Sequence, residues 1–425
     1  MSAFIRGSGI VLVLLVSSRS ARAADPCSNP TAVREIAACA VATHPLVAAE
    51  RERLASIAAA RTTAGVLLPS HPELSFSMAE RRLWQSTPGA TPVLNFYLTL
   101  SQKIQIAGER STRLAVVDAQ TKVQLQRVAF TELTVAAETA ETAIALAAAG
   151  ERAKLGETLR TVADRLTAVA DARRESALIS DLEAVLLTAE ATRISFEVDE
   201  VALAMVTLGS RLRSFVVKNT SAVALTALPP TLVGSSDEWV TRAMSLRADL
   251  GAVRAEADAQ EALAKQFERE RAPTVTLSAF LQSDGFGERV LGGGISIPIF
   301  LPSPLGPSRR GEIDGARARE RELSADASTR ERQVRHEVEA AASVLRARER
   351  QASQYSDDRI ARARTQLSAL VEALGSNKIA VREGLYSTRA LIDLLERGMH
   401  SRLAVWQARI ALARAAALPL EEVLP

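Results

Sequence analysis

The sequence predicts a mainly α-helical protein with a small β part, built from two similar halves of helix, strand, strand and helix. Three observations indicate this fold class. The 425 residues are 47% hydrophobic but only 4% aromatic, so the apolar content is mostly the Ala, Leu and Val of helices and coiled coils. Apolar residues keep heptad spacing over long stretches without proline. Two pairs of alternating segments interrupt these stretches.

The first 23 residues have the pattern of a secretory signal peptide. A short start carrying Arg6 precedes the apolar run GIVLVLLV and the small-residue ending Ala21-Arg22-Ala23. We expect cleavage after Ala23 and a mature protein beyond a bacterial inner membrane, where disulfides persist. A buried N-terminal helix or a membrane anchor is the alternative interpretation.

Charge and hydropathy exclude several protein classes. Subtracting the three leader arginines (Arg6, Arg19 and Arg22) from the 52 basic residues leaves 49, which equals the number of acidic residues. A neutral chain with evenly mixed signs, and no basic run interleaved with aromatics, does not favour nucleic-acid binding. After residue 20, no uninterrupted apolar run approaches the roughly 18–20 residues of a transmembrane helix. A polytopic helical membrane protein is therefore disfavoured.

The two cysteines lie near the start of the mature chain. Two cysteines are too few for a disulfide-dense scaffold, and none of the four histidines has metal-ligand spacing with them. A disulfide between Cys27 and Cys39 that pins the N-terminal segment is our interpretation, and lipid attachment at Cys27 is the alternative. We expect neither a metal site nor a cofactor, and the sequence has no nucleophile elbow or phosphate loop.

The mature chain reads as two repeats joined by a linker. Leu46–Pro69 and Leu250–Pro273 are alike at an offset of 204, and each is an Ala-, Arg- and Glu-rich helical segment that ends near a proline. Residues 24–217 are expected to form the first repeat and residues 241–425 the second. Between them, residues 218–240 lose periodicity and are expected to be a linker on the outside of the helices.

Each repeat carries two alternating segments separated by a turn-rich loop, which predicts a hairpin. The strands are expected at about 73–79 and 94–104, and at about 274–281 and 294–300. Strands of this length either cross a membrane when tilted or form a small soluble sheet. Trp84, Phe96 and Tyr97 either belong to an aromatic belt at a membrane interface or pack in a core.

The stretches after each strand pair are predicted to be long helices that pair side by side. Gly108–Arg174 contains no proline, and as one helix it would reach about 100 Å. Apolar residues step by three and four along it and along its partners, as in coiled coils. The seams are Leu155, Leu159, Val162, Leu166 and Val169; Leu187, Ala191, Ile194, Val198, Val201, Met205, Leu208 and Leu212; and Ile360, Ala363, Leu367, Leu370 and Leu374.

Three stretches, in this order and spacing, resemble the TolC-like outer membrane factor family. They are HPLVAAERERLASIAAARTTAGVLLPSHPELSFS at 44–77, LPPTLVGSSDEWVTRAMSLRADLGAVRAEADAQEALAKQFERERAPTVTLSAF at 228–280, and ISIPIFLPSPLGPSRRGEIDGARAR at 295–319. The second contains Arg247-Ala248-Asp249-Leu250 where the family usually has Arg-Pro-Asp-Leu. The resemblance covers about residues 30–418. The short loops and the short C-terminus are most similar to the metal-exporting branch.

The resemblance implies a homotrimer in the outer membrane of a Gram-negative bacterium, extending into the periplasm. Each protomer would give four strands to one 12-stranded transmembrane β-barrel, and the coiled-coil hairpins would form a trimeric α-barrel. Four strands alone cannot close a barrel, and open edges are not tolerated in lipid, so association of three protomers closes both parts.

The resemblance also implies a function and partners. Members of the family are passive exit ducts of tripartite efflux systems, with no chemistry of their own. The implied cargo is metal ions or small toxic compounds. The implied partners are a periplasmic adaptor, an inner-membrane pump of the RND type and outer membrane lipid.

Candidate docking sites follow from the family's Gly-x-x-Ser turns. The hairpin tips that meet the adaptor are expected at Ala177–Ser180 and at Gly384–Ser387. Ala177 departs from glycine, so the first turn is expected to be less sharp. The alternative interpretation is that these residues only cap helices.

Charged residues after the second tip are candidates for lining an aperture, by which we mean the constriction at the periplasmic end of the channel. Asp393 and Glu396 lie three residues apart on one helical face, and in a trimer each would form a ring of three carboxylates that selects cations. Arg389 and Arg397 are candidates for interchain pairs that gate this aperture. Glu183 takes the matching acidic position of the first repeat. A solvated charged face is the alternative interpretation.

Three other functions stay open. A type I protein secretion duct has the same fold with a protein cargo. A periplasmic adaptor carries one coiled-coil hairpin, whereas this sequence predicts two and duplicated strand pairs. A secreted enzyme on a helical scaffold is disfavoured because the sequence has no convergent polar motif.

Overall fold

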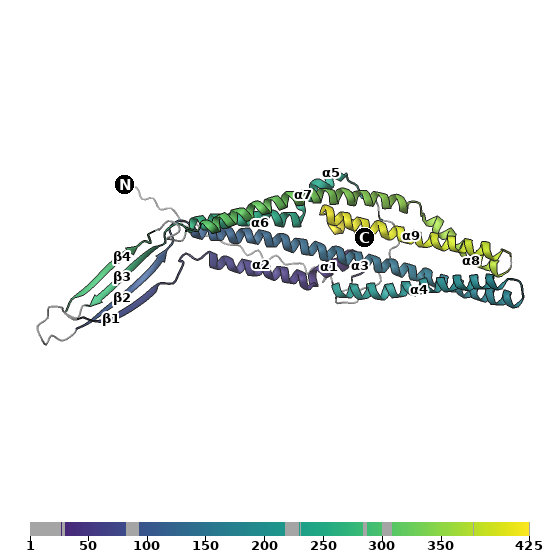
Figure 1. The fold of residues 1–425 in the computed structure, drawn as a ribbon, viewed down its shortest axis with the longest axis horizontal. Helices are drawn as coiled ribbons and strands as arrows, with labels where there is room; N and C mark the ends of the chain where they lie inside the picture. The colour runs from purple at the N-terminus through teal and green to yellow at the C-terminus, as the bar shows by residue number, and fades with distance from the viewer. Residues whose placement is uncertain are drawn as a thin grey trace, which may run out of the picture.

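The protein is elongated, with a four-stranded sheet at one end and long helices along the rest (Figure 1). The computed structural model describes residues 30–81, 93–216, 231–283, 287–299, 308–376 and 378–424, with Cys27 and Pro229. The expected leader at 1–23, Trp84 and most of the expected linker lie outside the described residues. The predicted fold class, mainly helical with a small β part, is confirmed for one protomer.

The described helices follow the expected order of long segments around two strand pairs. α3 and α4 form one antiparallel hairpin, and α8 and α9 form the other (Figure 1). None of them combines the length and the apolar character needed to cross a lipid bilayer. The helices are α1 (Val33–Thr43), α2 (Pro45–Ala64), α3 (Glu109–Glu175), α4 (Asp181–Phe215), α5 (Ser236–Leu246), α6 (Ala248–Arg269), α7 (Arg310–Ala352), α8 (Asp357–Gly375), α9 (Val381–Ala416) and α10 (Leu420–Val423).

The sheet consists of two hairpins joined side by side, one from each predicted repeat. Neighbouring strands are antiparallel in the order β1-β2-β3-β4, so β2 and β3 join the hairpins. Both expected hairpins are therefore present. The strands are β1 (Glu73–Arg81), β2 (Val93–Ile104), β3 (Val275–Ser283) and β4 (Arg289–Ser296).

The prediction of the fourth strand at 294–300 is wrong by several residues. The strand begins at Arg289 and ends at Ser296, because the glycine run at 292–294 belongs to the strand and not to the turn. A Cβ at Gly292 would lie 2.4 Å from Cζ of Phe280 on β3, so only glycine leaves room for that ring. Pro298 has no N–H for a ladder and follows the end of the strand.

The helices continue from the sheet as one layer. Next to the sheet, α2, α3, α6 and α7 lie in this order, and in the far half α3 packs between α4 and α9 (Figure 1). Of the described helices, only α3 extends all the way from the sheet to the tip turns (Figure 1). Its 67 residues span about 100 Å at 1.5 Å per residue, which confirms the long helix predicted over 108–174.

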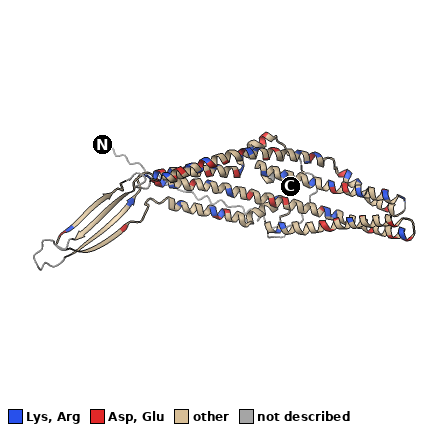
Figure 2. Ribbon diagram, viewed as in Figure 1, with Lys and Arg blue, Asp and Glu red and all other residues tan. Residues whose placement is uncertain are grey.

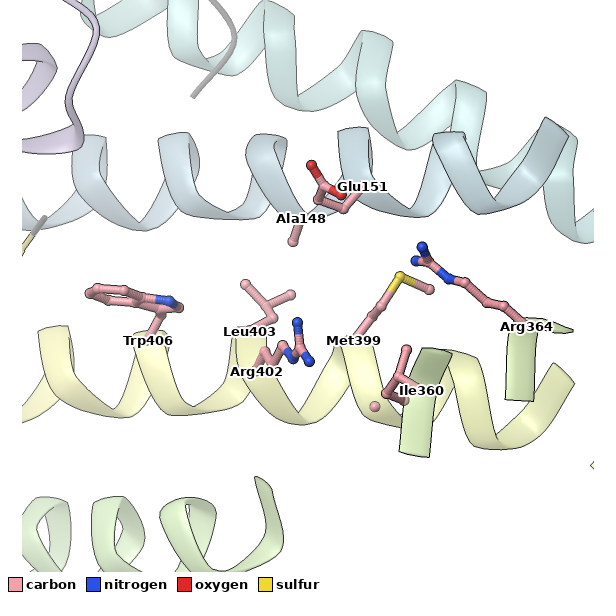
Figure 3. Close-up of a pocket in the computed structure, with 9 residues that line it drawn as sticks. Ala148, Glu151, Ile360, Arg364, Met399, Arg402, Leu403 and Trp406 are labelled. Carbon is pink, nitrogen blue, oxygen red and sulfur yellow. The ribbon is translucent and has the colours of Figure 1, made fainter. Parts of the chain in front are cut away.

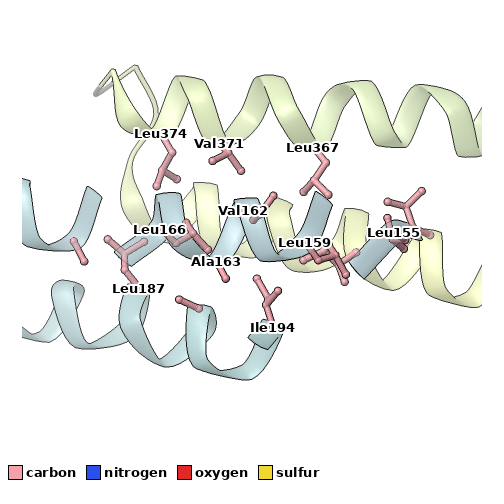
Figure 4. Close-up of a cluster of buried hydrophobic side chains, with 14 of the residues drawn as sticks. Leu155, Leu159, Val162, Ala163, Leu166, Leu187, Ile194, Leu367, Val371 and Leu374 are labelled. Atoms are coloured by element: carbon pink, nitrogen blue, oxygen red, sulfur yellow. The ribbon is translucent and has the colours of Figure 1, made fainter. Parts of the chain in front are cut away.

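The predicted heptad seams form the core of the far half. Figure 4 shows Leu166 of α3 between Leu187 of α4 and the α8 side chains, including Leu367. Each fully buried leucine contributes roughly 1.5–3 kcal/mol, so packing along the seam holds the hairpins together. In α8 the buried residues depart from the predicted heptad. Val371 is 3% exposed, whereas Leu370, which the heptad placed in the seam, is only half-buried.

A short helix begins inside the predicted linker. α5 starts at Ser236, and Ser235 and Glu238 form a capping box at its N-terminus. Trp239 and Val240 of α5 are buried against α7 and α9. Residues 236–240 are therefore a packed helix and not a linker.

An apolar cluster fastens the N-terminal segment at the waist of the molecule, by which we mean the level where α4 ends and α2 begins (Figure 1). Cys27 and Cys39 form a disulfide in this cluster. Their neighbours in the cluster include Ile144 of α3, Trp406 of α9 and Leu424 near the end of the chain. Both ends of the described chain are thus packed at the waist.

A charged network joins the end of α9 to the start of α6 at the same waist. Arg247 donates Nε and Nη2 to the two carboxylate oxygens of Asp249, both at 2.9 Å. Nε of Arg330 on α7 donates to the same carboxylate at 2.9 Å, and Glu337 pairs with Arg247. Arg247 also donates to the Ala415 carbonyl at 3.5 Å, near the helix end where carbonyls lack helical partners. The Arg247–Leu250 motif is therefore a junction between two helix ends.

Candidate functional site

The two faces of the sheet differ in chemistry. The register aligns the alternating apolar residues of all four strands, so that Leu98 lies opposite Phe76 on one side and Leu281 on the other. We call this the apolar face. It carries Leu74, Phe76, Met78, Leu94, Phe96, Leu98, Leu100, Leu277, Ala279, Leu281, Leu291 and Ile295, with Glu80, Gln102, Ser283 and Arg289 towards the strand ends. The polar face carries Ser75, Ser77, Asn95, Tyr97, Thr99, Ser101, Thr276, Ser278 and Gln282, with the apolar residues Ala79, Val93, Phe280 and Val290 among them.

No described helix covers the apolar face (Figure 1). Leu291 is 81% exposed and Ile295 is 72% exposed. The charged residues of the strands lie within two residues of a strand end, which leaves an uncharged band between them (Figure 2). They are Glu73, Glu80, Arg81, Lys103 and Arg289. An apolar band on one face, with polar residues on the other, is the pattern of strands that cross a membrane.

The described candidates for an aromatic belt point to opposite faces. Phe96 is on the apolar face, and Tyr97 is on the polar face, where its ring stacks on Phe280 with the centroids 5.2 Å apart. The Phe280 ring of this stacked pair lies over Gly292 of β4, which has no side chain. The aromatic pair therefore fixes the pairing of β2, β3 and β4 on the polar face.

The first hairpin tip closes sharply at Ala177, contrary to the expectation of a less sharp turn. Ala177 has φ 52°, in the left-handed region that glycine usually occupies after a helix. Its N–H donates to the Arg174 carbonyl at 3.0 Å, and the N–H of Leu178 donates to the Arg173 carbonyl at 2.9 Å. Ser180 then caps α4, and Glu183 closes the capping box on the Ser180 N–H at 2.9 Å. Hydrogen bonds from Ser180 lower the pKa of Glu183.

The second hairpin tip is not at Gly384–Ser387. α8 ends at Gly375 and α9 begins at Val381, so the turn precedes Gly384, which lies inside α9. Gly384 is buried for a different reason: a Cβ there would lie 1.7 Å from Cδ1 of Leu374. Its missing side chain allows close contact between α8 and α9. Ser387 is half-buried in the same helix.

One buried arginine links the two hairpin ends. Arg173, in the last turn of α3, is 5% exposed and donates to the carbonyl of Leu374 in the last turn of α8. The guanidinium thus meets the partial negative charge at the end of both helices. The tip turns lie side by side at the end of the molecule away from the sheet (Figure 1).

The candidate aperture residues lie on α9 in the far half. Asp393 is half-exposed, with a carboxylate oxygen 4.0 Å from Arg397 on the same helix. Glu396 faces α3, where a carboxylate oxygen is 3.8 Å from Arg152. Arg389 is exposed. Within one chain, Arg397 is therefore a helical partner of Asp393, and Glu183 belongs to the cap of α4 and not to this group.

Sequence reasoning missed the charged residues on α3 and α4 that face Glu396. Arg193 donates Nη2 to Glu190 at 2.6 Å and also pairs with Glu197. One carboxylate oxygen of Glu197 is buried and has no hydrogen-bond partner among the residues that the structure describes. The spacing of three and four residues among these side chains was the available signal, because such spacing places them on one helical face.

A pocket of about 60 Å³ lies between α3, α8 and α9 (Figure 3). Figure 3 shows Trp406, Leu403 and Met399 on the α9 wall, with Glu151 of α3 above and Arg364 of α8 at one end. Its walls are mostly apolar. Among the described residues there is no group of His, Cys, Asp and Glu that could hold a metal ion.

Comparison with solved structures gives the fold. The chain matches the outer-membrane channel OprN with TM-score 0.75 at 15% identity, covering 93% of this chain and 92% of that one. It matches the Campylobacter jejuni CmeC outer membrane channel with TM-score 0.72 at 13% identity, covering 90% and 85%. It matches the Vibrio cholerae outer membrane protein VceC with TM-score 0.68 at 17% identity, covering 90% and 95%. No protein-family model and no curated protein matches the sequence.

This chain has the fold of an outer-membrane channel. The resemblance to TolC-like outer membrane factors is therefore confirmed at the level of the fold. The likeness covers 90–93% of this chain and does not single out a metal-exporting branch, which stays a prediction. The channel fold accounts for the arrangement of one uncovered sheet followed by a layer of helices.

In this channel fold, Glu396 is held in an unfavourable environment. Burial, and then the carboxylate of Glu197, raise the pKa of Glu396 above its ordinary value of 4.5, although Arg152 and Arg193 oppose the shift. The native protein therefore holds this proton more tightly than the unfolded chain does. Stability from Glu396 is present below pH 4.5 and is lost as the pH rises through the raised pKa.

Replacement of Glu396 by glutamine is expected to stabilise the protein at neutral pH. The E396Q variant removes the carboxylate that is costly to ionise, so its thermal midpoint should exceed the wild-type value by about 1–4 °C at pH 7 and match it at pH 4. Thermal melts followed by circular dichroism measure both values. Asp393→Asn is the control on the same face, with little change expected at either pH. A lower midpoint for E396Q at pH 7 would contradict this account.

Proposed function

We propose that three copies of this chain form a passive duct through the outer membrane and the periplasm. The duct would release metal ions or small toxic compounds. An inner-membrane pump of the RND type would supply the energy, through a periplasmic adaptor. No chemistry is performed by the duct itself.

The uncovered apolar face of the sheet carries this proposal. A soluble sheet covers such a face with helices, because exposed apolar surface of this extent is unfavourable in water. The sheet is also open: β1 and β4 each have one edge without a partner strand in the described part of the chain. Lipid does not tolerate an open edge, so β1 of one copy would pair with β4 of the next until the barrel closes. Three copies supply the 12 strands of the proposed barrel.

Exposed apolar side chains at the tips support docking to an adaptor. Leu178 and Leu182 at the first tip are 62% and 69% exposed, and Tyr386 near the second tip is 79% exposed. On α4 such exposed apolar side chains continue from the tip along the helix, with Phe196 at 64% and Val206 at 67%. Exposed apolar surface of this kind is typical of a protein–protein contact. Ala177 and Ser180 shape the first turn. Gly384 acts one turn further back, by setting how closely α8 and α9 approach, and Ser387 lies one turn beyond it in α9.

Membrane fractionation tests the duct. We expect the mature protein in the outer membrane fraction after high-salt and alkaline washing, with the mass of a trimer in mild detergent. Planar bilayers that contain this trimer should conduct ions. Recovery in the soluble periplasmic fraction would contradict the proposal, because the sheet would then not be in lipid.

Charge reversal at the proposed aperture is expected to change ion selectivity. Asp393→Lys and Glu396→Lys each replace three carboxylates with three cations in the trimer, so the cation-to-anion permeability ratio should fall by about tenfold. Reversal potentials across planar bilayers under a salt gradient measure this ratio. Asp199→Lys is the control, because Asp199 is an exposed acid on α4 that pairs with Arg160 and does not face α9. An unchanged ratio in both test variants would remove Asp393 and Glu396 from the aperture.

A further inference from the structure

The disulfide at the waist is inaccessible in the folded protein. Cys27 is 4% exposed and Cys39 is 1% exposed. Both lie in the apolar cluster that contains Val216 after α4, Trp406 of α9 and Leu424. No bulky reagent reaches either sulfur while this cluster is packed, so the bond must form before the cluster closes.

The disulfide also bears on how α1 docks. α1 has 11 residues, and an isolated helix shorter than about 12–15 residues is marginal in water, so it depends on packing. Its buried residues pack against α3, and Cys39 is one of them. Cys27 lies 12 residues before Cys39, and closing a loop of about this length shifts a folding equilibrium by about 100-fold.

The two helix junctions at the waist are held by different forces. The junction of α9 with α6 is ionic, through Arg247 and Asp249. At the junction of α4 with α2, the rings of Phe215 and His44 lie 5.8 Å apart, and the surrounding residues are apolar. The disulfide lies in the same apolar cluster as this second junction, whereas the ionic junction contains no covalent link among the described residues.

We propose that maturation of this chain requires a thiol–disulfide oxidoreductase that joins Cys27 to Cys39 before α1 docks. The thiolate of one cysteine attacks the disulfide of the oxidant, which forms a mixed disulfide and releases one oxidant thiolate. The second cysteine attacks the chain sulfur of the mixed disulfide, which closes the Cys27–Cys39 bond and releases the other oxidant thiolate. Two electrons and two protons pass to the oxidant, which leaves as a dithiol. The partner is thus an oxidising enzyme of the periplasm, and Cys27 is not available for a lipid.

This inference rests on the proposed function for its location, because a protein that stayed in a reducing cytoplasm would not meet such an enzyme. The test is therefore built on the oxidation state and not on the position of the protein. Full-length protein is produced in cells with and without their periplasmic thiol oxidase. Free thiols are trapped in denatured cells with a maleimide-linked polymer, and intact mass is measured on the purified protein.

We expect no polymer shift in cells that contain the oxidase, and a two-thiol form in cells that lack it. Hydrogen exchange of the α1 amides should be about 100-fold faster in the Cys27→Ser/Cys39→Ser variant than in the oxidised wild type. The level of this variant should be the same in both kinds of cell, because it has no thiol to oxidise. That control separates a loss of oxidation from a general loss of folding.

Three outcomes would overturn the inference. They are a reactive thiol in wild-type protein from oxidase-containing cells, equal oxidation in the two kinds of cell, or a diacylglyceryl mass increment on Cys27. Oxidised protein with protected α1 amides that is recovered only from the soluble periplasm would support the inference and contradict the duct.

Discussion

Replacement of Leu98 by arginine is expected to keep the protein out of the outer membrane. Leu98 lies in the middle of β2 on the apolar face, opposite Phe76 and Leu281. An arginine on the lipid face of a barrel costs about 2–4 kcal/mol near the bilayer midplane, and a trimer carries three copies. The fraction of the protein that resists alkaline extraction from outer membranes should therefore fall by at least about tenfold.

The adjacent residue provides the control for this variant. Thr99 is on the polar face of the same strand, so Thr99→Arg introduces the same charge one residue away but directs it to the interior of the proposed barrel. We expect Thr99→Arg to insert normally and to lower the preference for cations. If the two variants lost membrane insertion equally, the apolar face would not be the face that contacts lipid.

Replacement of Asp249 by alanine is expected to cause the largest loss of stability among substitutions in the helical part. The Asp249 side chain is 12% exposed and accepts hydrogen bonds from Arg247 and Arg330. Its removal takes one of two carboxylates from Arg247 and Arg330, whose side chains are 9% and 32% exposed, and leaves Glu337 as their partner. The expected cost is therefore about 3 kcal/mol, the lower end of the range for a broken buried pair. The free energy of unfolding, measured by denaturant titration of the detergent-solubilised protein, should fall by this amount.

An exposed pair between the same two helices is the matched control. Arg254 of α6 and Glu331 of α7 are 2.6 Å apart, with side chains 45% and 41% exposed. Glu331→Ala should cost less than about 1 kcal/mol, because water screens this pair. If both alanine variants lose the same stability, the network around Asp249 has no special role.

The pH dependence of the Asp249 effect has a defined sign. Burial alone would raise the pKa of Asp249, but hydrogen bonds from Arg247 and Arg330 outweigh it and lower the pKa below the ordinary 3.8. The stabilisation is therefore present above pH 3.8 and is lost as the pH falls through the lowered pKa. The difference between the wild type and the Asp249→Ala variant should persist at pH 5 and above.

Local patterns in the sequence were sufficient to predict most of the fold. The strands at 73–79 and 94–104 were found because one residue in two is apolar, and the long helices were found because the apolar steps alternate between three and four. β4 was misplaced because its glycines resemble a turn. Their role depends on the Phe280 ring in the neighbouring strand, and a single-strand pattern contains no information about that ring.

The second tip was misplaced for a related reason. Gly384 was taken as a turn residue, although the cluster Gly375-Ser376-Asn377 is the stronger local turn signal. Glycine serves two purposes in helical proteins, left-handed turns and close helix contacts, and the sequence alone does not separate them. At the first tip, Ala177 adopts the left-handed conformation without glycine, so the residue type was again a poor guide.

The ionic contacts between different helices were beyond the reach of sequence reasoning. Asp249 pairs with Arg247 two residues away, but its second partner, Arg330, is 81 residues further along the chain. Arg152 and Glu396 are further apart still and meet only because α3 and α9 pack side by side. In a chain with 101 candidate charges, such pairs are fixed by the tertiary fold and not by local spacing.

The continuity of α3 has a mechanical consequence. Among the described helices, α3 alone is a continuous rod from the end of β2 to the tip turn. The other helices lie end to end in pairs, and each pair is interrupted by a break: between α4 and α2, between α9 and α6, and between α8 and α7. A continuous helix transmits torque along its length, whereas two helices placed end to end can bend at the break between them, which we call a hinge. Motion of α8 and α9 at the far end would therefore be absorbed at the hinges, while α3 keeps the sheet in a constant orientation.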